Sequence, residues 1–270
     1  MKHDFLPIQG PSRAPSFGFA LAVVIILLGS FIAPRPACAA TEEAGPQKNY
    51  LIRLEGMINE AYAEALMRKM KEADDQGADT IILELDTPGG TVNASQKLGD
   101  FIFADVRAKV VAYINTKAYS GGTMVALACD EIYIDSDVGM MGDVAPITGG
   151  GQEVGEKFQA PIRKTMTNYA RKKGYPEPLV EAMVTKEIEV YRVHLEGEPE
   201  DTFHYLRRAE LEAWSDEKRN SVDDKELVVA KGELLTLSAS DAVRYGFASG
   251  EVTSFPALCD ALDIAPGSVE

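Results

Sequence analysis

Ser120 lies between a β-rich apolar run, residues 110–114, and a run of small residues that favours a helix. A hydroxyl at such a turn projects from the end of a sheet, and the N–H groups after it lie at a helix N-terminus, where anionic oxygen is stabilised. An acyl-transfer nucleophile needs this geometry. Serine is also a common helix cap and Gly-Gly a common turn, so this stretch alone favours a structural role.

A serine nucleophile needs a base, and the chain has three histidines: His3, His194 and His204. His3 lies in a predicted targeting segment, and the other two lie in a predicted β-hairpin, where half-exposed histidines are common. The order of triad residues varies between folds, so a Ser-His-Asp triad is disfavoured without being excluded. The remaining base is a lysine.

Lys157 is the lysine whose position suits a base, because it follows a Gly-rich loop and opens a predicted helix beside apolar Phe158. A lysine base must lose its proton near pH 7, so burial must lower its pKa. A helix N-terminus also disfavours the ammonium form. The alternatives are Lys164 and Lys117, and an arbitrary lysine is most often a solvated surface residue.

Strand-like and helix-like segments alternate along the chain, which is typical of a parallel sheet with right-handed crossovers. Functional loops in such sheets gather at the carboxyl ends of the strands. The turn 86–90 and Ser120 are therefore expected at the same edge, which favours a catalytic serine over a cap. The predicted strands are 50–58, 80–85, 110–114 and 131–135, and the predicted helices are 61–76, 91–104, 121–128, 156–173 and 178–185.

The second half of the predicted domain holds a hairpin and a well-marked helix start. Residues 188–195 and 202–206 suggest the two strands of the hairpin, whereas the charged stretch 207–226 has no clear pattern. Ser238 is a candidate helix cap, with Asp241 three residues later. The Gly-rich loop 138–151 carries apolar side chains predicted to form a substrate pocket, namely Met140, Met141, Val144 and Ile147.

The motifs Asp86-Thr-Pro-Gly-Gly-Thr91 and Ala118-Tyr-Ser-Gly-Gly122, with the Lys157 helix, resemble the N-terminal domain of NfeD-type membrane serine proteases. This group belongs to the Clp protease and signal peptide peptidase A superfamily, and the resemblance covers roughly residues 48–258. It implies a ClpP/crotonase-like α/β fold of repeated β-β-α units with a β-hairpin insertion.

The same resemblance implies roles for four residues. Ser120 would be the nucleophile and Lys157 the base, and the N–H groups of Gly90 and Gly121 would form the oxyanion hole. A homo-oligomer, at least a dimer, and a hydrophobic segment of a membrane-associated protein as substrate are also implied. Two departures are that Gly121 stands where the family usually has alanine, and that Asp143 could hold the Lys157 ammonium.

The N-terminal 40 residues are predicted to be an export signal or a membrane anchor. The uncharged run 17–33 follows positive charges and precedes Ala37-Cys38-Ala39, which suits a cleavage site. A linker at 41–48, a protease domain at 49–260 and a tail at 261–270 follow. We therefore expect an exported protein, periplasmic or otherwise extracytoplasmic, which residues 17–33 anchor to the membrane if they are not cleaved.

Composition narrows the other possibilities. The formal net charge is −15 without a basic cluster, so nucleic acid is not expected as a partner. The three cysteines have no metal-ligand spacing, and no metal or cofactor is predicted. Two alternatives to the peptidase stay open: a crotonase-type acyl-CoA enzyme, and a non-catalytic scaffold of the same fold.

Overall fold

The computed structural model describes residues 47–152 and 154–270. The predicted signal or anchor at 1–40, with its apolar run 17–33, and most of the predicted linker 41–48 lie outside the described residues. Within the described ranges, no helix is both long and apolar enough to cross a membrane.

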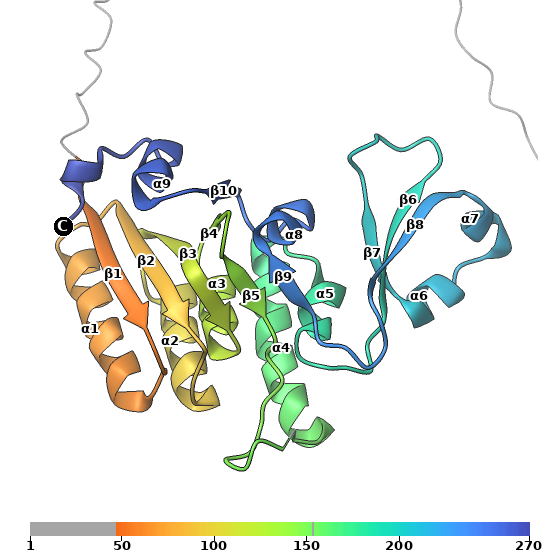
Figure 1. Cartoon of the computed structure of the whole chain (residues 1–270), viewed down its shortest axis with the longest axis horizontal. Helices are drawn as coiled ribbons and strands as arrows, with labels where there is room; N and C mark the ends of the chain where they lie inside the picture. The colour runs from red at the N-terminus through yellow and green to blue at the C-terminus, as the bar shows by residue number, and fades with distance from the viewer. Residues whose placement is uncertain (1–46, 153) are drawn as a thin grey trace, which may run out of the picture. The chain divides into compact units, whose positions relative to one another are not determined.

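Five parallel strands form the main sheet, in the order β1-β2-β3-β4-β10 (Figure 1). A short strand, β5, pairs in parallel with the end of β3, and β9 pairs antiparallel with β5. The central strands are buried on both faces, as their near-continuous apolar sequence predicts. The strands are β1 (Asn49–Glu55), β2 (Thr80–Thr87), β3 (Lys109–Tyr119), β4 (Glu131–Asp135), β5 (Met140–Gly142), β9 (Thr236–Ser238) and β10 (Gly250–Val252).

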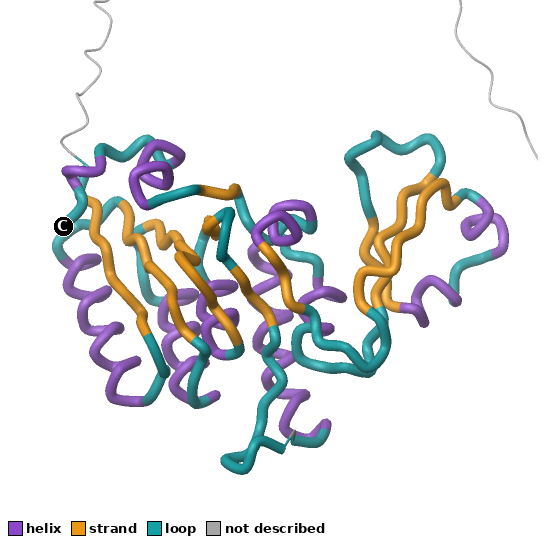
Figure 2. Tube along the Cα trace, in the orientation of Figure 1, coloured by secondary structure: helices purple, strands orange, loops and turns teal. Residues whose placement is uncertain are grey.

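Helices α1 to α4 cover one face of this sheet, and their apolar side chains join the strands in the large core (Figures 1 and 2). On the other face, Leu258 of α9 packs with Ile82 and Tyr113 in a smaller cluster. The helices are α1 (Glu60–Asp75), α2 (Val92–Ala104), α3 (Gly121–Ala128), α4 (Glu156–Lys173), α5 (Glu177–Ala182), α8 (Ala239–Arg244), α9 (Phe255–Ala261) and the 3₁₀ turn Pro266–Ser268.

The predicted hairpin is confirmed, because β6 (Val190–Leu195) and β7 (His204–Arg207) pair antiparallel. A third strand, β8 (Val222–Val229), pairs with the other edge of β6 and completes a separate antiparallel sheet. The charged stretch that had no clear pattern holds two short helices, α6 (Arg208–Glu212) and α7 (Asp216–Asn220), and the first half of β8.

The chain's last residues, which the sequence suggests are a tail, lie beside β1. The Leu51 N–H donates to the Glu270 carbonyl at 2.8 Å, and the Glu270 N–H donates to Asn49 at 2.9 Å. These hydrogen bonds occupy part of the edge of β1 that would otherwise be unpaired.

Ser238 caps α8 as the sequence predicts, and this cap allows a stability test. Its Oγ accepts from the Asp241 N–H at 3.2 Å, and the Asp241 carboxylate accepts from the Ser238 hydroxyl at 2.7 Å. We expect Ser238→Ala to lower the free energy of unfolding by about 1 kcal/mol. In urea the midpoint should fall without a change in m-value. Ser249→Ala is the control, because Ser249 is exposed and its hydroxyl bonds to nothing among the described residues. Equal midpoints for the two variants would contradict the cap.

Candidate active site

Ser120 is the residue that joins the end of β3 to the start of α3, and its backbone is strained. Its φ of 51° and ψ of −118° lie in a region that residues with a side chain rarely adopt. Hydrogen bonds hold the strain on both sides: the Ser120 N–H donates to the Gly142 carbonyl at 3.0 Å, and the Ser120 carbonyl accepts from Met124 at 3.2 Å. A strained serine between a strand and a helix is the geometry of a nucleophile turn.

The Thr-Pro-Gly-Gly turn after β2 packs directly against this serine. A Cβ on Gly89 would lie 2.7 Å from the Ser120 Cβ and 2.8 Å from the Tyr119 carbonyl oxygen. The prediction that turn 86–90 and Ser120 meet at one edge of the sheet is therefore confirmed. The contact also explains why glycine is needed here, since Gly89 has a φ of 97° as well.

Two N–H groups beside the serine have no acceptor among the described residues. The Ile58 N–H donates to the Gly89 carbonyl, and the Thr91 N–H donates to the Ile58 carbonyl. Neither hydrogen bond uses the N–H of Gly90, the residue between Gly89 and Thr91. Gly121 is the first residue of α3, where an N–H has no intrahelical partner. A Cβ on Gly121 would lie 3.5 Å from the Gly90 nitrogen, so the two residues are neighbours. Such a pair of donors suits an oxyanion hole, which remains a prediction.

Lys157 is exposed in the first turn of α4. No hydrogen bond or ion pair within the described residues involves its amine, so none joins it to Ser120 or to Asp143. Lys164, also on α4, is exposed too. The Lys117 amine forms an ion pair with the Asp86 carboxylate, at a distance of 3.4 Å.

Helix α4 is held firmly although Lys157 is exposed. The buried Tyr169 hydroxyl donates to the Asp100 carboxylate on α2 at 2.5 Å. Burial and this hydrogen bond both raise the pKa of Tyr169. Near the middle of the helix, Arg163 donates to Thr185 at 2.5 Å. Figure 1 shows that α4 begins at the edge where β2 and β3 end, which is also the edge of the serine turn.

The four residues predicted to line a substrate pocket do not share one surface. Met141 and Val144 are buried in the core, Met140 is half-buried on β5, and the Ile147 side chain is 63% exposed. Strand β5 nevertheless runs beside the last residues of β3, which places Met140 and Met141 close to the serine turn in register. The pocket remains a prediction.

Among the described residues, both cysteines are buried and both histidines lie against carboxylates. Cys129 is buried, and burial raises the pKa of its thiol, so the nucleophilic thiolate is disfavoured. His204 lies 2.8 Å from Glu198, and His194 lies 3.4 Å from Asp223, both within the three-stranded sheet region. No cluster of side chains suited to a metal ion occurs in the described part of the chain.

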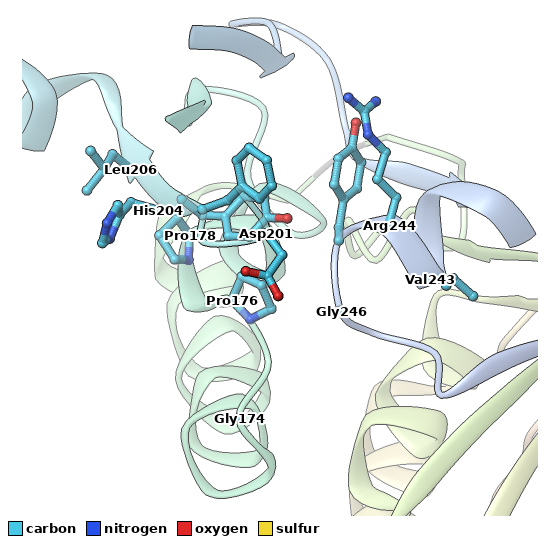
Figure 3. A pocket seen from close by; sticks show the side chains of 12 residues that line it. Gly174, Pro176, Pro178, Asp201, His204, Leu206, Val243, Arg244 and Gly246 are labelled. Carbon is cyan, nitrogen blue, oxygen red and sulfur yellow. The ribbon is translucent and has the colours of Figure 1, made fainter. Parts of the chain in front are cut away.

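A separate pocket of about 560 Å³ lies between α5, β7 and the end of α8 (Figure 3). Two of its lining side chains are paired, because His204 bonds to Glu198 and Arg244 bonds to Glu226 at 2.7 Å. Ser120 is not among its lining residues.

One buried residue beside the serine turn has no signal in the sequence. Ser95, in the first turns of α2, is completely buried, and its hydroxyl has no hydrogen-bond partner among the described residues. A serine near the start of a helix is common, so only the packing of α2 on α3 reveals it.

These elements define an α/β domain with a ClpP-like fold, and solved structures agree. The 1510-N membrane-bound stomatin-specific protease, as a lysine-to-alanine variant with a substrate peptide, matches with a TM-score of 0.58 at 19% identity over 80% of each chain. Its serine-to-alanine variant matches with a TM-score of 0.59 at 18% identity, over 83% of this chain and 91% of that one. The predicted fold class is confirmed.

Sequence comparisons give the family. The membrane protein NfeD1b of Bacillus subtilis is 28% identical over 236 residues, 87% of this chain and 46% of that protein. The membrane-bound protease PH1510 of Pyrococcus horikoshii is 28% identical over 150 residues, 52% of this chain and 33% of that protein. This chain thus spans less than half the length of either relative. The model of the NfeD1b N-terminal domain family matches residues 48–207, and the chain belongs to that family.

Proposed function

We propose that this domain is a serine endopeptidase with Ser120 as its nucleophile. The strained Ser120 between β3 and α3, next to two N–H groups that have no acceptor within residues 47–152 and 154–270, is the observation that carries the proposal. Similarity to a protein described as a membrane-bound protease supports it, as does a ClpP-like neighbour solved with a substrate peptide.

The proposed reaction uses a Ser-Lys dyad. The neutral Lys157 amine takes the Ser120 proton while the Ser120 oxygen attacks a peptide carbonyl. The Gly90 and Gly121 N–H groups stabilise the resulting oxyanion. Its collapse breaks the C–N bond, and the ammonium returns a proton to the leaving amine. Water then attacks the acyl-enzyme with the same amine as base, releasing the acid and restoring the Ser120 hydroxyl.

The exposure of Lys157 sets a condition on this mechanism. A lysine base must be shielded from water and must come within about 3 Å of the proton it removes. Catalytic hydrogen bonds often tighten only when substrate is bound. We propose that a bound polypeptide covers Lys157, and that exposed Phe158 next to it favours an apolar segment; the Phe158 side chain is 63% exposed.

Two lysines on α4 provide a matched test of the base. We expect Lys157→Ala to lower kcat for peptide hydrolysis by a factor of about 10² to 10⁴, the usual contribution of general acid–base catalysis. Lys164→Ala should leave kcat unchanged, because Lys164 is also exposed but lies about two turns further along α4, away from the edge of the serine turn. The measurement is steady-state hydrolysis of a quenched fluorescent peptide with an apolar core. A loss in Lys164→Ala alone would assign the base to Lys164 instead.

The nucleophile itself is tested by covalent labelling. The purified protein is treated with a fluorophosphonate probe, and the labelled peptide is identified by mass spectrometry. We expect the probe on Ser120, since only an activated hydroxyl reacts at a useful rate. Labelling of another serine, with Ser120 unmodified, would overturn the assignment.

Location, substrate and assembly extend this proposal. We propose that residues 49–260 form the protease domain and that residues 1–40 export it to an extracytoplasmic compartment. The proposed substrates are hydrophobic segments of membrane-associated proteins, and the proposed active form is a homo-oligomer.

The exposed Lys157 also supports one alternative, a non-catalytic scaffold with the same fold. A scaffold would keep the turn around Ser120 without a buried base. Folded protein that neither takes up the probe nor hydrolyses any polypeptide would favour it over the peptidase.

A further inference from the structure

Ser95 is a buried serine whose hydroxyl is unused by the fold. Its backbone N–H donates to the Thr91 carbonyl at 3.0 Å, as a helical residue should. Its side chain is 0% exposed, and Oγ has no hydrogen-bond partner among the described residues. Leaving a buried hydroxyl without a hydrogen bond costs about 1–3 kcal/mol, so the presence of a serine at this buried position needs an explanation.

The hydroxyl lies against the first residue of α3. A Cβ on Gly121 would be 2.1 Å from the Ser95 Oγ, and the same point is 3.5 Å from the Gly90 nitrogen. The Gly90 and Gly121 N–H groups also lack acceptors in the described ranges. Three hydrogen-bond donors without acceptors therefore gather at one place beside Ser120.

We propose that Ser95 is a third hydrogen-bond donor to the oxyanion that forms when Ser120 attacks a carbonyl. This inference rests on the proposed peptidase function. Ser95 keeps its proton throughout and donates only a hydrogen bond, so no bond to it forms or breaks. The unpaired hydroxyl raises the free energy of the free enzyme and gains its partner as negative charge develops. An interaction of this kind stabilises the transition state more than the ground state.

The same contact accounts for the glycine that follows Ser120. A methyl group at position 121 would overlap the Ser95 Oγ and would also lie 2.8 Å from its Cβ. Gly121 therefore makes room for the Ser95 hydroxyl, and the two residues form a matched pair.

Ser95→Ala tests the proposal through a split between activity and stability. We expect kcat for peptide hydrolysis to fall about 100-fold or more, the usual effect of removing one oxyanion donor, with little change in KM. We also expect the melting temperature not to fall, because the variant loses an unpaired polar group. A purely structural hydroxyl would give the reverse result, with a lower melting temperature and an unchanged kcat.

Thr123→Val provides the contrast for stability. The Thr123 hydroxyl is equally buried, but it donates to the Ala118 carbonyl at 2.5 Å and accepts from Gly142 at 2.8 Å. Its replacement should lower the melting temperature clearly. If Ser95→Ala lowers the melting temperature as much, the hydroxyl has a structural partner and the proposal is wrong.

A double variant covers the case in which Ser95→Ala folds poorly. In Ser95→Gly with Gly121→Ala, a methyl group takes the place of the hydroxyl, so packing is kept while the donor is lost. We expect this folded variant to show the same loss of kcat. Wild-type kcat in either variant, in protein whose Ser120 still takes the fluorophosphonate, would overturn the third donor and leave the peptidase intact. Wild-type protein that neither labels nor hydrolyses peptide would reject both.

Discussion

Ser120→Gly and Ser120→Ala are expected to abolish peptide hydrolysis equally, while only the glycine variant becomes more stable than the wild type. Both variants lack the hydroxyl of the proposed nucleophile, so no acyl-enzyme is expected, and removal of a serine nucleophile lowers kcat by a factor of about 10⁶ in a serine protease. Both variants should therefore fall to the background rate in the fluorescent peptide assay and should take up no fluorophosphonate.

The difference in stability follows from the backbone at Ser120. At a φ of 51° and a ψ of −118°, a residue with a Cβ is strained by about 1–3 kcal/mol. Glycine relieves this strain, but its greater chain entropy in the unfolded state costs about 0.5–1 kcal/mol. Because the strain is usually larger than this cost, we expect a net rise in the free energy of unfolding. Alanine keeps the Cβ, and with it the strain. Urea unfolding measures both variants, and equal midpoints would show that the turn is not strained.

Most of the main sheet and its first helices could be predicted from the sequence. The central strands are short apolar runs, and the helices have apolar faces, so each element is specified by its own residues. Ser238 and Asp241 likewise mark the start of α8 locally. Strand β8 was not predicted because half of its residues are charged, and its strand conformation depends on pairing with β6. Tertiary pairing there overrides local preference.

The site was predictable to a smaller extent, because it depends on how elements pack. The meeting of the Thr-Pro-Gly-Gly turn with Ser120 follows from strand order and could be predicted. The exposure of Lys157 could not be predicted, because the apolar residues near it in the sequence differ in burial: Ile162 is buried, whereas Phe158 is exposed. Val144 resembles a pocket residue in sequence, yet its N–H donates to the Met183 carbonyl in the core.

The strain at Ser120 and the isolation of Ser95 leave no mark in the sequence. Both result from the approach of α3 to its neighbours. A Cβ on Gly89 would lie 2.7 Å from the Ser120 Cβ, and a Cβ on Gly121 would lie 2.1 Å from the Ser95 Oγ. Glycine at these two positions therefore allows the close approach. A pair of glycines in a sequence indicates a turn, but it does not indicate which residues pack against that turn.

Gly90→Ala is expected to remove both stability and activity, because Gly90 has the least room of the glycines that the structure describes. Its Cβ would lie 1.9 Å from the Ile58 carbonyl oxygen and 2.6 Å from the Ile58 carbonyl carbon and nitrogen. All three atoms are backbone, so no rotamer change can make space. Overpacking of flexible cores usually costs 1–3 kcal/mol, and a clash with backbone should reach about 3 kcal/mol or more.

For a domain of this size, that loss corresponds to a fall in melting temperature of about 6–12 °C. Hydrolysis should vanish even below the new melting temperature, because the backbone shift that relieves the clash also moves the Gly90 N–H away from the position of the oxyanion. Gly149→Ala is the matched control, since nothing lies within 4 Å of its added methyl group. Its stability should stay within about 0.5 kcal/mol of the wild type. A Gly90→Ala protein with wild-type melting temperature and activity would show that the turn does not lie against Ile58, and the oxyanion hole would then have to be built from other donors.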